Sequence, residues 1–191
     1  MKHIPGVDMS SGSLGQGISA AVGMALSAKL SGDSYRVYTL LGDGEIQEGQ
    51  VWEAAMLAAH RKLDNLVVIV DNNNLQIDGA IDEVNSPYPI DQKFEAFNFH
   101  VINVDGHDFD ALDAAFKEAK ATKGCPTAII AKTVKGKGVS FMENQASWHG
   151  AAPNDEQYET AMADLEKVGE ALCQKLSLIH ISEPTRRSYI S

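Results

Sequence analysis

The stretch from Gly42 to Gly79 constrains the fold of this chain more than any other. It opens with Gly-Asp-Gly directly after one apolar run and reaches Asp-Asn-Asn-Asn directly after a second. The segment between them is expected to be a helix, because its apolar residues recur at a helical period: Trp52, Ala55, Met56, Ala59 and Leu63. Strand, helix and strand within this length predict a βαβ unit whose two strands are parallel and close together.

Two oxygen-bearing side chains follow the ends of these expected strands. Asp43 and Asn73 are separated by 73 − 43 = 30 positions, and the carboxyl edge of an open α/β sheet is where ligands bind. A carboxylate and an amide oxygen suit Mg²⁺, which shares an octahedral oxygen shell with substrate phosphates. Gly42 and Gly44 allow a tight turn, and the Gly44 N–H can face a phosphate oxygen. Both motifs could also be simple turns, but their pairing one βαβ unit apart favours a ligand site.

The rest of the chain repeats the same alternation. Further strands are expected at 99–104 and 127–133, with an amphipathic helix at 109–122 that starts at an Asp108 N-cap. Repeated strand and helix units predict an α/β fold with a doubly wound, mostly parallel sheet and helices on both faces.

The segment from Ile18 to Leu30 is apolar on nearly every face and predicts a buried helix. The serines and glycines ahead of it, from Ser10 to Gly17, would let backbone N–H groups approach a ligand at the helix N-terminus. A small-residue helix start that packs tightly on a sheet is the alternative, and both interpretations stay open on this feature alone.

Composition limits the classes of function. With 191 residues and 44% apolar content, the chain can bury one full core. Its net charge of −10 disfavours a nucleic-acid partner, because phosphate backbones require basic patches. No apolar run is long enough to cross a membrane and no signal peptide is recognised. Cys125 and Cys173 form neither a disulfide framework nor a metal knuckle, so a cytoplasmic setting is expected.

The two ends differ in character from the middle. Residues 1–5 resemble a loop from inside a domain, so the domain, assigned to residues 1–175, is expected to lack an upstream portion. A last helix is expected from Asn154 to about Cys173. Residues 176–191, LSLIHISEPTRRSYIS, show no helical period, and we interpret them as a non-native or disordered tail.

The motifs carry a family resemblance. Gly-Asp-Gly followed about thirty positions later by Asn-Asn is the signature of thiamine-diphosphate enzymes. Between Gly6 and Leu165 the chain resembles transketolase, particularly the separate N-terminal subunit of split bacterial transketolases. The stretches that carry this resemblance, in order, are GVDMSSGSLGQGISAAVGMAL, GDGEIQEGQVWEAAMLAAH, DNNNLQIDG, AKTVKGKGVSFMEN and SWHGAAPN.

The resemblance implies a thiamine-diphosphate-binding fold of the diphosphate-binding (PP) type and a set of cofactor residues. The Asp43 carboxylate, the Asn73 side chain and the Leu75 backbone carbonyl would bind Mg²⁺, with Ca²⁺ or Mn²⁺ as possible substitutes. Gly44 would contact the diphosphate.

Further residues are implied by the same resemblance. Gly12, Ser13 and Leu14 would lie against the aminopyrimidine end of the cofactor through backbone groups. Lys135 matches a lysine near the cofactor. His149, within Trp148-His149-Gly150, matches a histidine that contacts the diphosphate and faces the substrate channel, and it is the candidate catalytic residue. By itself a tryptophan–histidine pair more often reflects packing. His60, His100 and His107 have weaker claims.

The implied reaction moves a two-carbon ketol unit from a ketose phosphate to an aldose phosphate, as in the pentose phosphate pathway. The glutamate that activates the cofactor in this family lies in a pyrimidine-binding domain, so a C-terminal subunit carrying that domain is the implied partner, in a homodimeric or heterotetrameric assembly. The isolated chain is expected to be inactive.

The motifs leave several alternatives to compare. The chain could be a non-catalytic cofactor-binding piece. 1-Deoxyxylulose-5-phosphate synthase and the E1 component of pyruvate dehydrogenase share the paired motif but do not usually carry the other stretches together. A haloacid-dehalogenase phosphatase is rejected because its Asp-x-Asp motif must precede Gly-Asp-Gly, whereas Asp108-Phe109-Asp110 follows it.

Overall fold

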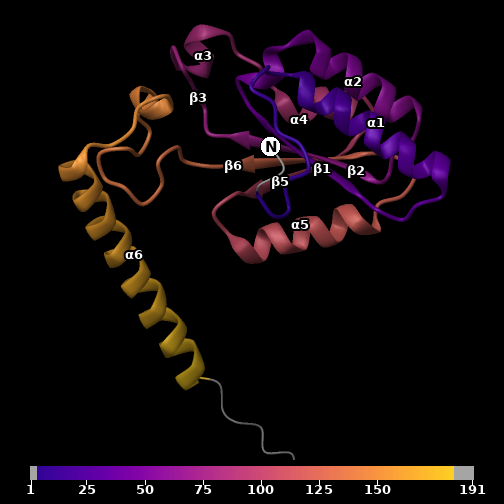
Figure 1. The fold of residues 1–191 in the computed structure, drawn as a ribbon. Coiled ribbons are helices and arrows are strands. Elements are labelled where there is room, and N and C mark those ends of the chain that lie inside the picture. The colour runs from indigo at the N-terminus through magenta and orange to yellow at the C-terminus, as the bar shows by residue number, and fades with distance from the viewer. Residues whose placement is uncertain (1–3, 183–191) are drawn as a thin grey trace, which may run out of the picture. The chain divides into compact units, whose positions relative to one another are not determined.

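A computed structural model describes the backbone of residues 4–182 and the side chains of residues 4–173 (Figure 1). The chain divides into two compact units, residues 1–134 and residues 135–191, and each is described by itself. Of the expected tail, residues 176–191, the part from 183 to 191 lies outside the described residues.

The first unit is built on a four-stranded parallel sheet. Its strands lie in the order β1 (Val37–Gly42), β2 (Leu66–Asn72), β6 (Thr127–Lys132) and β5 (His100–Asp105). Gly42 lies beside Asp71 in the pairing of β1 with β2. The loops that follow these two strands therefore start side by side, as the sequence predicted.

Helices cover both faces of the sheet, which confirms the doubly wound α/β prediction. Helices α1 (Gln16–Ser31), α2 (Gly49–His60) and α4 (Ile90–Ala96) lie on one face and α5 (Phe109–Ala121) on the other (Figure 1). The two cores share strand β2: Val68 packs in the cluster that contains α1, α2 and α4 residues, and Val67 packs with Ala115 and Ala119 of α5. Strand residues buried in this way on both sides are typical of parallel sheets.

The start of α5 follows the prediction from sequence. The Asp108 side chain accepts hydrogen bonds from the backbone N–H groups of Asp110, at 2.9 Å, and Ala111, at 3.0 Å. These are N–H groups that the helix itself leaves without partners.

Helix α1 departs from the expectation of a helix buried on nearly every face. Only one face is buried, at Ile18, Ala21, Val22, Ala25 and Ala28. Leu30 is 87% exposed and Met24 is 38% exposed. The physical reason is that α1 packs with its one apolar face on α2 and on strands β1 and β2.

Apolar side chains are also exposed on α2 and on β1. The buried residues of α2 are Val51, Ala54, Ala55 and Ala58, so Met56 points away from the core and is 62% exposed. Strand β1 is an outer strand of the sheet. Its Tyr38 and Leu40 side chains are 49% and 68% exposed, although the sequence run is apolar.

Several short elements connect the longer helices and strands. Strands β3 (Leu75–Gln76) and β4 (Gly79–Ala80) form an antiparallel pair, followed by α3 (Ile81–Val84), and the 3₁₀ helix η1 (Glu45–Gln47) follows β1. The second unit holds η2 (Ala146–His149) and α6 (Asp155–Ser182), which continues past the expected end at Cys173. None of the helices between residues 4 and 182 has the length and apolar character needed to cross a bilayer.

Candidate functional site

Asp43 is the buried centre of the candidate site. It follows β1 at the carboxyl edge of the sheet and is only 1% exposed. Its Oδ1 atom accepts a hydrogen bond from the Gly44 N–H at 2.9 Å. Its Oδ2 atom accepts from the Asn72 side-chain amide at 3.1 Å and from the Asn74 N–H at 2.7 Å. The loops after β1 and β2 are thus joined through this one carboxylate.

The electrostatics of Asp43 favour an added cation. Burial raises the pKa of the Asp43 carboxyl, and the nearby Asp71 charge raises it further, against the opposing effect of its three hydrogen bonds. None of the ion pairs among the described side chains involves Asp43. Buried charges are normally paired or bound to metal, so this carboxylate is a candidate cation ligand.

The three consecutive asparagines after β2 have different roles. Asn72 and Asn74 contact Asp43, as described above, whereas the Asn73 side-chain oxygen accepts a hydrogen bond from the Leu75 N–H at 3.0 Å. This oxygen has a second lone pair and remains an available donor to a metal. Asn74 has a left-handed backbone with φ of +64°, a conformation that asparagine tolerates better than most residues. Asn73 and Leu75 as metal ligands stay predictions.

Tyr88 completes this network and was missed by sequence reasoning. Its hydroxyl accepts a hydrogen bond from the Asn72 side-chain amide at 2.6 Å and donates one to the Asn74 side-chain oxygen. Burial raises the pKa of Tyr88, the hydrogen bond from Asn72 opposes this, and the Asp43 charge raises it again. No sequence pattern links position 88 to position 43, because the contact depends on how the loop before α4 returns to the sheet edge.

Glu45 joins two loops. Its Oε1 atom accepts a hydrogen bond from the Gly15 N–H at 2.8 Å, and its Oε2 atom accepts from the Gly42 N–H at 3.1 Å. Gly15 directly precedes α1, so one carboxylate connects the start of that helix to the loop of Asp43. The distance in sequence between Gly15 and Glu45 hides this contact.

The loop before α1 carries three of the predicted cofactor residues. Gly12, Ser13 and Leu14 are all exposed. The Ser13 N–H donates to the Ser11 hydroxyl at 3.1 Å. The helix N-terminus is therefore partly occupied by internal hydrogen bonds, at Ser13 and at Gly15, and the prediction that the loop meets the aminopyrimidine stays untested.

Gly44 lies where a side chain has little room. A Cβ atom at this position would be 3.2 Å from the Gln76 Cβ. Its N–H points back to the Asp43 carboxylate. The predicted contact of Gly44 with a diphosphate stays a prediction, and the tight packing gives one reason for glycine here.

Lys135 and His149 belong to the second unit. The Lys135 ammonium nitrogen lies 3.5 Å from the His149 Nδ1 atom, and His149 is exposed. The Trp148 indole N–H donates to the Phe141 carbonyl at 3.1 Å, and the two rings pack edge to face at 5.2 Å. Trp148 is therefore a packing residue that fixes η2, while the neighbouring His149 faces solvent.

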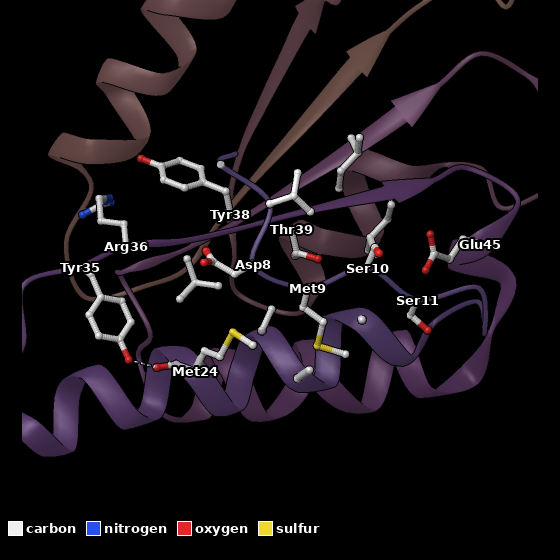
Figure 2. A pocket seen from close by; sticks show the side chains of 18 residues that line it. Asp8, Met9, Ser10, Ser11, Met24, Tyr35, Arg36, Tyr38, Thr39 and Glu45 are labelled. Atoms are coloured by element: carbon white, nitrogen blue, oxygen red, sulfur yellow. Dashed lines mark hydrogen bonds between the residues drawn. The ribbon is translucent and has the colours of Figure 1, made fainter. Parts of the chain in front are cut away.

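A cavity of about 700 Å³ lies along the outer side of β1, between that strand, α1 and the loop of residues 6–11 (Figure 2). Among the described residues, Glu45 is the one from the segment 42–79 that lines this cavity, and none of the predicted ligands does. The cavity and the hydrogen-bond network of Asp43 therefore lie at different places in the first unit. We assign the site by the chemistry, since volume alone does not select a ligand.

Fold and site together define a class: an α/β domain that presents a buried carboxylate and amide oxygens where two adjacent parallel strands end. The family model for "Transketolase, thiamine diphosphate binding domain" matches residues 1–167, and the chain belongs to this family. The resemblance stated from the motifs is thereby confirmed.

Individual relatives agree with this assignment. A 6-deoxy-6-sulfo-D-fructose transketolase subunit of Clostridium sp. (strain MSTE9) is 46% identical over 169 residues, covering 88% of this chain and 62% of the relative. An apulose-4-phosphate transketolase subunit of Phocaeicola vulgatus is 41% identical, covering 89% of this chain and 60% of the relative. The crystal structure of transketolase from Campylobacter jejuni superposes with a TM-score of 0.78 at 36% identity, over 84% of this chain and 26% of that one. The chain thus spans about three fifths of the curated subunits it matches.

Proposed function

We propose that this chain supplies the diphosphate-binding half of a transketolase, which transfers a two-carbon ketol unit from a ketose phosphate to an aldose phosphate. Membership of the thiamine-diphosphate-binding family supports the cofactor. The relatives named as transketolase subunits support the reaction class. Their names mention different sugars, so the proposal specifies the class of substrate and leaves the individual sugar open.

The single observation that carries the metal assignment is the buried carboxylate of Asp43, which pairs with no cationic side chain among the described residues. We assign Mg²⁺ to this carboxylate, the Asn73 side-chain oxygen and the Leu75 carbonyl, and Ca²⁺ or Mn²⁺ could replace it. The donor set consists of hard oxygens, which suits Mg²⁺ bound together with a diphosphate. A divalent ion would also neutralise the charge that burial destabilises.

The remaining residues have roles that follow from their chemistry. When bound, thiamine diphosphate supplies the nucleophilic carbon for cleavage of a bond next to a carbonyl. Gly44 leaves room for the diphosphate, and Lys135 adds positive charge for it. His149 donates a hydrogen bond to a diphosphate or substrate oxygen and is the proposed catalytic residue of this chain. Gly12, Ser13 and Leu14 present backbone groups to the aminopyrimidine.

A partner is part of the proposal. The two named relatives are subunits, and we propose a C-terminal subunit that carries the pyrimidine-binding domain, in a homodimeric or heterotetrameric assembly. The second candidate is a chain that binds the cofactor and does no chemistry by itself. 1-Deoxyxylulose-5-phosphate synthase is disfavoured because the named relatives are transketolases.

The metal assignment is tested by calorimetric titration of Mg²⁺ into the chain with thiamine diphosphate present. Asp43→Asn keeps the shape of the side chain and removes its charge. We expect binding to weaken by at least about 100-fold, since even residues behind metal ligands change affinity by 10–100-fold. Asp113→Asn is the matched control, because Asp113 pairs with Lys117 on the surface of α5. Equal affinity in the wild type and Asp43→Asn would show the metal assignment to be wrong.

The reaction is tested with xylulose 5-phosphate and ribose 5-phosphate. We expect no turnover by the isolated chain and turnover when the C-terminal subunit is added. Turnover by the chain alone would contradict the need for a partner. Cofactor binding in the complex without turnover of any ketose and aldose pair would favour the second candidate.

A further inference from the structure

We propose that Tyr88 is a positioning residue for the cation site, because its hydroxyl fixes the turn that presents Asn73 and Leu75. The inference rests on the proposed function, since it assumes that a divalent cation binds beside Asp43. It concerns a residue outside the segment 42–79 and outside the motifs of the family resemblance.

The geometry places one hydroxyl between the two neighbours of Asn73. The Tyr88 hydroxyl accepts from the Asn72 side-chain amide at 2.6 Å and donates to the Asn74 side-chain oxygen. Each of these asparagines also donates to Asp43 Oδ2, through its side chain in Asn72 and its backbone N–H in Asn74. The turn is therefore held on one side by a carboxylate and on the other by a phenol.

The phenol is itself fixed by packing. The Tyr88 side chain packs against the hydrophobic cluster that includes Phe94 and Phe99. A tyrosine suits this position, because it has an apolar ring that packs on the core and a hydroxyl that forms hydrogen bonds. Packing of the ring restrains the two side-chain torsions. The core thereby sets the position of the hydroxyl, and the hydroxyl sets the position of Asn72 and Asn74.

The contact matters most for Asn74. Its backbone has a φ of +64°, which is uncommon for residues other than glycine. The Asn74 side-chain oxygen receives the Tyr88 hydroxyl proton, and its backbone N–H points to Asp43. Loss of the hydroxyl releases the side chain and lets the turn relax toward ordinary backbone conformations. The Asn73 oxygen and the Leu75 carbonyl, one residue away on either side, would then lose their fixed spacing from Asp43.

The variant that isolates this effect is Tyr88→Phe, which keeps the ring in the core and removes only the hydroxyl. Tyr35→Phe is the matched control, because its hydroxyl also donates one hydrogen bond within the first unit, to the Met24 carbonyl at 3.0 Å (Figure 2). Tyr88→Phe loses two phenolic hydrogen bonds at the candidate site, and Tyr35→Phe loses one away from it.

The first measurement uses the metal-free chain and follows hydrogen exchange of the Asn74 and Leu75 backbone amides by nuclear magnetic resonance. In Tyr88→Phe we expect exchange to be about tenfold faster at both amides, because local opening becomes easier. In Tyr35→Phe it should remain as in the wild type. Unchanged exchange in Tyr88→Phe would overturn the inference without reference to any ligand.

The second measurement uses Mn²⁺ with thiamine diphosphate, detected by paramagnetic broadening of amide signals around Asp43. We expect the Mn²⁺ dissociation constant to rise about tenfold in Tyr88→Phe, at the lower end of the range for residues behind metal ligands, and to stay constant in Tyr35→Phe. Wild-type affinity in Tyr88→Phe would overturn the positioning role even if exchange increases. Absence of specific broadening in the wild type itself would instead overturn the proposed function and, with it, the role of Tyr88 toward a cation.

Discussion

The amino and carboxyl edges of the parallel sheet hold aspartates in opposite electrostatic states. At the amino end, Asp64 accepts hydrogen bonds from the Lys29 ammonium at 2.7 Å and from the Gly124 N–H at 3.0 Å. Burial alone would raise the pKa of Asp64, but these two hydrogen bonds and the charges of Lys29 and Lys123 together hold the pKa below its usual value. At the carboxyl end, Asp43 is more deeply buried, no ion pair of the described residues includes it, and its pKa is raised.

The difference separates a structural edge of the sheet from the edge that holds the candidate site. At the amino edge the chain supplies its own cation: the Lys29–Asp64 ion pair links α1 to the loop before β2, and the hydrogen bond from Gly124 links that loop to the one before β6. At the carboxyl edge the described residues supply hydrogen-bond donors to Asp43 but no cation. An added cation would therefore be attracted more strongly to Asp43 than to Asp64. Two aspartates that flank neighbouring strands thus have different roles, and only their surroundings distinguish them.

The largest difference between the two edges is expected from a pair of glycine substitutions, one at each edge. Gly44→Ala places a Cβ atom 3.2 Å from the Gln76 Cβ in the candidate site. Crowding of this kind lowers the free energy of unfolding by about 1–3 kcal/mol. We expect the resulting shift of the Gly44 N–H to weaken thiamine-diphosphate binding as well, and a calorimetric titration measures that loss.

Its control at the opposite edge is Gly124→Ala. Gly124 has a φ of +78° and open space around a Cβ, so the change should lower the free energy of unfolding by about 1 kcal/mol and leave cofactor affinity unchanged. A loss of affinity at Gly124 as large as that at Gly44 would break the contrast between the edges.

An intermediate effect is expected at Glu45, which fastens the carboxyl edge much as Asp64 fastens the amino edge. Glu45→Ala removes two hydrogen bonds to backbone N–H groups, those of Gly15 and Gly42. We expect a loss of about 1–3 kcal/mol in stability, faster amide exchange at Gly15 and weaker thiamine-diphosphate binding. Asp64→Ala should reduce stability by a similar amount without changing binding. Urea unfolding and titration of both variants decide whether the two fasteners differ in this way.

The smallest effect is a pair of opposite pH dependences in the metal-free chain. The lowered pKa of Asp64 means that its contribution to stability is present above its unfolded value of 3.8 and is lost as pH falls through the folded pKa. The raised pKa of Asp43 means that its contribution is fully present below 3.8 and is lost as pH rises through the folded pKa.

Urea unfolding between about pH 3 and pH 7 compares the wild type with Asp64→Asn and Asp43→Asn. The stability of the wild type relative to Asp64→Asn should rise with pH, by less than about 1 kcal/mol because Asp64 is partly solvated. Relative to Asp43→Asn it should fall with pH, and saturating Mg²⁺ with thiamine diphosphate should remove that fall. Slopes of the same sign in metal-free buffer would contradict the electrostatic distinction.

Sequence patterns were sufficient for the parallel sheet and for the edge at which the site lies. Apolar runs that end in polar motifs have few other solutions, and Gly42 and Asp71 do lie side by side. The cap at Asp108 was equally predictable, because a local hydrogen bond depends only on neighbouring residues. The family was predictable because several motifs occur in one order.

The remaining features depend on side chains that meet across the fold. Among three consecutive asparagines, the sequence could not show that Asn72 and Asn74 reach Asp43, since that depends on the backbone conformation of the turn. Tyr88 reaches the site from the loop before α4, and Glu45 reaches from the site to Gly15 before α1; neither contact has a local signature. The exposed face of α1 was also missed, because a run of apolar residues predicts a buried helix whether or not another element covers it.

The network around Asp43 has one further consequence, which concerns inheritance. Asp43, the three asparagines and Tyr88 all come from one continuous stretch of fewer than fifty residues. A network encoded in one uninterrupted segment can be passed on or duplicated as a unit, because its hydrogen-bonding partners are inherited together.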